Sequence, residues 1–280
     1  MTSLASTPAP ITPARRARPR AQQVTQLRVL RSEWTKLRTQ PAAVWTLLAA
    51  IITTAGFGVL YSLVRETRPP HGAAAIAAFD PAAISLSGVQ LAQIAVGVLG
   101  VLLITAEYGT GLIRVTFAAV PRRLPVLWSK AVLVAVSTLI ISLPAVLIAF
   151  AGGQSVLARA HLSVALGAPG VTRAVIGSAL YMTVAALLGL GLGALLRSTA
   201  LGIAALFGLL FGIQILAGLL PGSAAQTVTK FLPGPAGQAV TTVHPDPASS
   251  LAPWTGLGVF ALWAAILLTA AALRMRRGDA

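Results

Sequence analysis

Few side chains in this sequence could carry out chemistry, and they lie far apart. The histidines His71, His161 and His244 have no cluster of carboxylates near them, so we expect solvated loop histidines rather than metal ligands. Asp80 and Asp246 each precede a proline, which is typical of turns. The absence of cysteine excludes disulfides and thiolate nucleophiles. Because no nucleophile has a neighbouring base, we predict no catalytic residue and no metal site.

A nucleotide-binding site is not expected either. The phosphate-binding loop of many ATPases ends in Gly-Lys, whose neighbouring backbone amides hold the phosphates. In this sequence no glycine directly precedes any of the lysines Lys36, Lys130 and Lys230. We therefore predict that the chain is not an enzyme and binds no cofactor directly.

The composition predicts a chain that is embedded in a membrane. Of its 280 residues, 56% are hydrophobic and only 10% are charged, and the mean hydropathy is +0.83. Soluble domains are about 45–50% apolar and about 25% charged, so this chain has too few polar residues to cover a soluble fold. Its 21 basic residues flank apolar runs, so we expect the lipid bilayer, and not nucleic acid, as a partner.

Six apolar segments are long enough to cross a bilayer, which takes a helix of about 20 residues. None has a charged residue in its middle, and none alternates as a membrane strand does. We therefore predict an all-α polytopic fold with six transmembrane helices, in which Lys130 and Arg197 extend from span ends to the lipid headgroups. The expected spans are 44–64, 86–105, 127–150, 174–196, 200–220 and 256–273.

The basic residues also predict the orientation of the chain. With the N terminus inside, sixteen arginines and lysines fall in inner segments and five in outer segments, out of the 21 present. Membrane proteins carry their excess of basic residues on the cytoplasmic side. We expect both termini in the cytoplasm.

Two segments precede the first span, and residues 41–280 are expected to form one transmembrane domain. Residues 1–23 are rich in Pro, Ala, Thr and Arg and are predicted to be a disordered basic tail. In residues 24–40, apolar side chains recur every three or four positions, which predicts an amphipathic helix in the membrane interface; a solvated basic run is the alternative. The residues assigned to this helix are Leu27, Leu30, Glu33, Trp34 and Leu37.

The sequence "EYGTGLIRVTFAAVPRR", residues 107–123, interrupts the apolar pattern between spans two and three. Gly109 and Gly111 allow the backbone to turn sharply, and the apolar residues after them, including Phe117, fit a short helix that ends at Pro121. A plain connector between helices takes about 2–8 residues. This longer one, with its apolar stripe, indicates a surface that meets a partner.

Five segments carry a resemblance to a known family: "RSEWTKLRT", "EYGTGLIRVTFAAVPRR", "LLRSTALG", "FLPGPAGQAV" and "LRMRRGDA". They stand before span one, after span two, between spans four and five, before span six and at the end. In this order they resemble the permease subunits of ABC transporters, in the type-two exporter class common in high-GC bacteria. The likeness extends over almost the whole chain.

The resemblance implies a permease that exports a substrate in the bacterial plasma membrane. Two permeases, identical or homologous, would form the pore, and separate ABC ATPase subunits would dock beneath them and bind ATP and Mg. Residues 24–40 would be the interface helix, and residues 107–123 would contain the coupling helix, although Gly109 stands where family members often have Arg or Lys. The residues assigned to ATPase coupling are Glu107, Tyr108, Gly109, Thr110, Gly111, Arg114 and Phe117.

Several features leave alternatives open. A non-transporting membrane scaffold or immunity protein is the alternative function, and co-purification of an ATPase would separate the two. The predicted spans have no buried ionisable residue, which argues against a proton-coupled transporter. Within them, Gln93 and Gln214 either bond between helices or contact the cargo.

Two glycine pairs and one outer segment complete the predictions. Gly189 and Gly193, like Gly208 and Gly212, are spaced for close helix packing, and the second pair is a candidate subunit interface. Residues 221–253 either enter the outer leaflet as short helices broken at Pro233 and Pro235 or form an ordinary loop. In the family that this chain resembles, such a segment closes the pore from outside.

Overall fold

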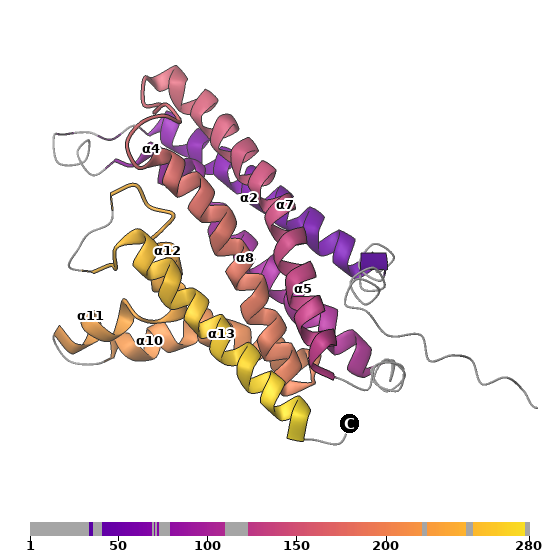
Figure 1. Ribbon diagram of the computed structural model, residues 1–280. Coiled ribbons are helices and arrows are strands. Elements are labelled where there is room, and N and C mark those ends of the chain that lie inside the picture. Colours follow the sequence, from indigo (N-terminus) through magenta and orange to yellow (C-terminus); the bar gives the residue numbers. More distant parts are fainter. Residues whose placement is uncertain are drawn as a thin grey trace, which may run out of the picture.

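Most residues in the described part of the chain are helical. A computed structural model describes residues 34–35, 41–68, 70, 72, 79–109, 123–219, 223–244 and 249–277, and no strand occurs among them. Within these ranges, six helices are long and apolar enough to cross a membrane. The predicted all-α polytopic fold with six spans is confirmed, and the chain has the architecture of a multi-pass membrane protein (Figure 1).

The six spans are built from eight helical elements, because the fifth span is divided into three. The undivided spans are α2 (Pro41–Thr67), α5 (Val89–Gly109), α7 (Arg123–Leu157), α8 (Val171–Leu196) and α13 (Pro253–Arg277). The fifth span consists of α9 (Thr199–Phe207), the π-helix η2 (Gly208–Gly212) and α10 (Ile213–Gly218). The shorter elements are α4 (Pro81–Ser85), η1 (Ala158–Ala160), α11 (Ser223–Thr229) and α12 (Pro233–Gln238).

The central helix of the bundle is α8, which contacts α5, α7 and α13 (Figure 1). Of its most apolar window, 72% is buried inside the protein, compared with 22% for the first span. Glycine allows this central position. A Cβ atom at Gly189 of α8 would overlap the carbonyl oxygen of Gly97 in α5, and one at Gly100 would overlap that of Ala186. Small residues therefore let the α5 and α8 backbones touch, as the spacing of Gly189 and Gly193 predicted.

The second glycine pair behaves differently. Gly208 and Gly212 lie in the π-helix η2, and a Cβ atom at either would meet no atom of this chain within 4 Å. They make no close helix contact within the described part of the chain. Their assignment to a subunit interface stays a prediction.

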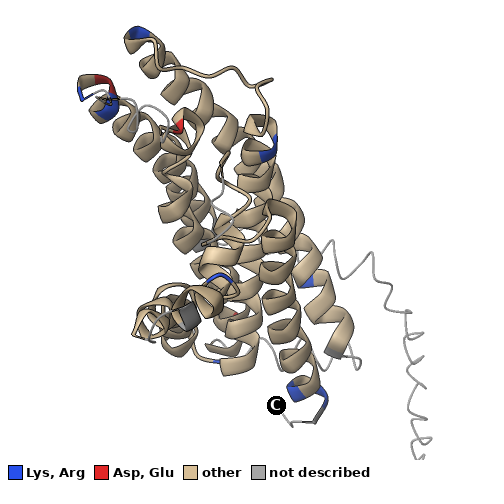
Figure 2. Ribbon diagram, turned by 90° about the vertical axis from the view of Figure 1, so that its left-hand side faces the viewer, with Lys and Arg blue, Asp and Glu red and all other residues tan. Residues whose placement is uncertain are grey.

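We call the two ends of the bundle the basal end and the distal end, and define each by the helices that begin or end there. At the basal end, α5, α8 and α13 end, and α7 and α9 begin. At the distal end, α5, α8 and α13 begin, and α4 and α12 lie there (Figure 1). Most of the ribbon carries no charge, while basic residues gather near the C terminus at the basal end (Figure 2).

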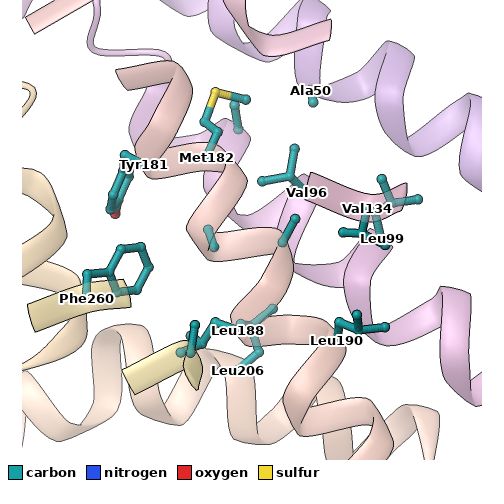
Figure 3. Close-up of a cluster of buried hydrophobic side chains, with 14 of the residues drawn as sticks. Ala50, Val96, Leu99, Val134, Tyr181, Met182, Leu188, Leu190, Leu206 and Phe260 are labelled. Carbon is teal, nitrogen blue, oxygen red and sulfur yellow. The ribbon is translucent and has the colours of Figure 1, made fainter. Parts of the chain in front are cut away.

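Part of the segment 221–253 folds into two short helices, as one alternative predicted, and its entry into the outer leaflet stays a prediction. α12 begins at Pro233, which suits the first turn of a helix because its missing N–H has no partner there. Pro235 also lies inside this first turn, so the predicted break at Pro235 is wrong. Gly237 of α12 lies against the rings of Tyr181 and Phe260, whose centroids are 5.2 Å apart (Figure 3). α12 is thus packed into the distal end.

The predicted amphipathic helix lies mostly outside the described residues. Trp34 and Thr35 are helical, and the side chain of Trp34 is exposed. Leu27, Leu30, Glu33 and Leu37 lie outside the described part, so the interface helix stays a prediction.

Candidate functional site

A buried ion pair joins two spans at the basal end. Glu107 lies in the last turn of α5, and Lys130 lies about two turns into α7. The Lys130 Nζ donates a hydrogen bond to the Glu107 Oε1 at 3.1 Å, and the two side chains are only 5% and 8% exposed. In a buried pair of this kind each charge offsets part of the cost of removing the other from water. The pair therefore joins the last turn of α5 directly to α7.

This pair corrects two predictions from the sequence. Lys130 does not extend toward headgroups, and the spans do contain buried ionisable residues, because both partners lie within the candidate spans Val89–Gly109 and Leu124–Ala160. The physical reason is the length of α5, which continues to Gly109 rather than ending near residue 105. The extra turn brings a carboxylate within reach of the lysine.

Beside the pair, Tyr108 and Arg197 join α5 to the turn between α8 and α9. The guanidinium carbon of Arg197 lies 5.5 Å from the centroid of the Tyr108 ring, within the range of a cation–π contact. Arg197 is partly exposed, so its predicted extension to the headgroups stays a prediction. The Thr199 hydroxyl donates to the Thr105 hydroxyl at 2.8 Å, which adds a second link between α9 and α5.

A third link comes from the last span. Arg274 of α13 donates a hydrogen bond to the carbonyl oxygen of Leu195, at the end of α8. The basal end thus brings together five helix termini: those of α5, α7, α8, α9 and α13. We call Glu107, Lys130, Tyr108 and Arg197 the basal cluster.

The predicted coupling residues fall partly within this site. Glu107 and Tyr108 belong to the basal cluster, and Gly109 is the exposed last residue of α5. Thr110, Gly111, Arg114 and Phe117 lie outside the described residues, so their role stays a prediction. No group of three histidine, cysteine or carboxylate side chains that could hold a metal ion occurs in the described part of the chain.

At the distal half of the bundle, amide side chains connect α5, α8 and α12. The Tyr181 hydroxyl donates to the Gln93 Oε1, and the Gln93 Nε2 donates to the Gln90 carbonyl oxygen at 2.9 Å. The Gln238 Nε2 donates to the Gln90 Oε1 at 2.9 Å. Gln93 therefore bonds between helices, which was one of its two predicted roles. Gln214 instead donates to Leu210 of its own span.

Polar side chains also hold the distal loops to the bundle. Asp80 caps α4 by accepting from the Ala83 N–H at 3.0 Å, and its other oxygen accepts from the Val243 N–H at 3.1 Å. Arg173 donates to the Val243 carbonyl oxygen at 3.0 Å. Gln154 donates to the Pro81 carbonyl oxygen and accepts from the Val164 N–H. The Asp80 and Arg173 contacts hold the turn that follows α12, and the Gln154 contacts hold α4 and the segment around Val164 to α7.

Sequence reasoning missed three members of these networks. Gln90, Tyr181 and Gln238 were not selected, although a polar side chain in or beside an apolar span is itself a signal that it has a partner. The partner relationships themselves were not visible, since Gln90 and Gln238 are 148 positions apart.

Comparison with known proteins gives no matching family model and no matching curated protein. The functional interpretation therefore depends on the architecture, the basal cluster and the sequence.

Proposed function

We propose that the chain is the membrane-spanning permease subunit of an ATP-driven ABC exporter and that it couples to a separate ATPase at the basal end. One observation carries this proposal: the buried Glu107–Lys130 pair joins the two helices that flank residues 110–122. Those residues contain the predicted docking segment. Any force on it reaches the membrane through α5 and α7.

The energetics of the pair support a mechanical role. A buried ion pair contributes little net stability, because desolvation offsets most of the Coulomb attraction, and apolar residues of similar size are often as stable. Its defined geometry is what apolar packing would not reproduce. We infer that the pair keeps α5 and α7 at a fixed separation while the segment between them is displaced.

The rest of the fold fits the same proposal. The basal end would face the cytoplasm, in line with the basic residues of the C terminus and of the N-terminal arm. α12, packed at the distal end, would close the pathway from outside, and a second permease would complete the pore. ATP and Mg would bind to the partner ATPase.

The proposal is tested by purifying the tagged chain from its native membranes in mild detergent. We expect an ABC ATPase subunit to co-purify. Glu107→Ala and Phe117→Asp should insert normally but recover less of it, with a larger loss for Phe117→Asp because it places a charge in an apolar contact. Normal ATPase recovery with both variants would contradict docking at this segment, and recovery of no ATPase with the unaltered chain would favour a scaffold or immunity protein.

A further inference from the structure

Arg197 has an unusual backbone conformation for its residue type. It is the C-cap of α8 with φ 57° and ψ 18°, in the left-handed region, and its N–H donates to the Gly193 carbonyl oxygen at 2.9 Å. Helices commonly end on such a residue, but it is usually glycine, because a Cβ atom is strained there. Among the described residues, His161 is the only other non-glycine residue with positive φ.

The turn itself does not require an arginine. Only Arg197 and Ser198 separate α8 from α9, and Ser198 caps α9 by accepting from the Leu201 N–H. Glycine at position 197 would form the same turn with less strain. The reason for an arginine must therefore lie in its side chain. Strained residues of this kind persist where the surrounding structure holds them in place, and they cluster at functional sites.

The side chain has one aromatic partner in the described part of the chain. Its guanidinium lies over the ring of Tyr108, the residue after Glu107 in the last turn of α5. The Arg197 Nε is buried, so the stack is shielded from solvent on that side. Contacts between a cation and an aromatic face strengthen when they are desolvated.

We propose that Arg197 is a positioning residue, which stacks on Tyr108 to hold the turn between α8 and α9 on the end of α5. This inference rests on the proposed function, in which a movement at the end of α5 displaces α7 through Glu107. The same movement would also displace the α8–α9 turn. The Thr105–Thr199 hydrogen bond and the Arg274 contact with Leu195 hold the same turn in register. α9 continues into η2, against which α12 packs, so the turn lies on a contiguous path to the distal end.

The decisive variant is Arg197→Gly, with His161→Gly as its matched control. Both place glycine at a position with positive φ and relieve backbone strain there, so neither should lower the unfolding temperature of the chain in lipid nanodiscs. His161 is exposed at the distal end and has no contact with the basal cluster. We expect Arg197→Gly alone to reduce the stimulation of ATP hydrolysis by the permease, by about three- to tenfold. Equal stimulation in the two variants would overturn the proposal.

A double variant tests the stated partner. Tyr108→Leu removes the aromatic face, and it should reduce the stimulation by a similar factor. Because the two side chains act through one contact, Tyr108→Leu combined with Arg197→Gly should cause no greater loss than the more severe single variant. If the fold-reductions in stimulation of the two single variants multiply in the double variant, the two residues act independently. That result would contradict the proposed contact between Arg197 and Tyr108.

A measurement without ATP separates this inference from the proposed function. The chain has no cysteine, so spin labels can be placed on cysteines at Gly109 and Ala200 alone. Both positions are exposed, and a Cβ atom at Gly109 meets nothing within 4 Å. Arg197→Gly should broaden the distance distribution between the labels, and His161→Gly should not. An unchanged distribution overturns the positioning role, whereas absence of ATPase activity in the unaltered complex refutes only the proposed function.

Discussion

The strongest mechanical prediction concerns the charges of Glu107 and Lys130. Lys130→Met keeps the length and apolar stem of the side chain but removes its charge, which leaves the Glu107 carboxylate in a site where the two side chains are 8% exposed or less. Breaking a buried pair in this way typically costs about 3–5 kcal/mol, because the remaining charge loses a partner of opposite sign in a site that excludes water. We expect a loss of this size in the free energy of unfolding, measured by equilibrium denaturation in mixed micelles.

Removing both charges should separate stability from coupling. In Glu107→Leu combined with Lys130→Met no buried charge is left, so most of the lost stability should return. The fixed geometry does not return, so stimulation of the ATPase should stay low. Exchanging the two residues, with Glu107→Lys and Lys130→Glu, should recover part of both. Wild-type stability and stimulation in Lys130→Met would refute the argument, because the pair would then contribute neither stability nor position.

Three further predictions test the fold. Gly189→Ala should lower the free energy of unfolding, because its Cβ would overlap the Gly97 carbonyl oxygen. The control Gly258→Ala should not lower it, because its Cβ meets nothing within 4 Å. Equal effects of the two variants would contradict the close crossing of α5 and α8. Tyr181→Phe should cost about 1–3 kcal/mol in the same unfolding assay, because Gln93 loses a buried donor, and no loss would mean that this bond is not formed. Reporter proteins fused at the exposed Gly167 and after residue 280 should report outside and inside respectively, and the reverse result would refute the orientation.

The existence of the spans could be predicted from the sequence, but several boundaries could not. Apolarity alone finds six segments, since each must cross the bilayer. Hydropathy ends the second span near residue 105 because Glu107 is charged, whereas α5 includes Glu107 because Lys130, 23 positions away, compensates its charge. α7 likewise continues to Leu157, since Gln154 finds its partners on the segment around Pro81.

The candidate site was predictable only in part. Glu107 and Tyr108 were selected by resemblance to a family, but Lys130 and Arg197 were each interpreted as headgroup anchors, which is the general behaviour of basic residues at span ends. That rule considers the residue and its depth alone. The stack of Arg197 depends on a left-handed turn, which no feature of the sequence "LLRSTALG" indicates, because glycine would normally occupy that position.

The central claim is that this chain transmits ATP hydrolysis by a separate subunit, and the rate of that hydrolysis tests it most directly. The co-purified ATPase should be measured alone and together with the chain in lipid nanodiscs, with Phe117→Asp as the variant and His161→Gly as the control. We expect the chain and His161→Gly to raise the hydrolysis rate and Phe117→Asp to leave it near that of the ATPase alone. A hydrolysis rate that does not change when the chain is added would contradict the account.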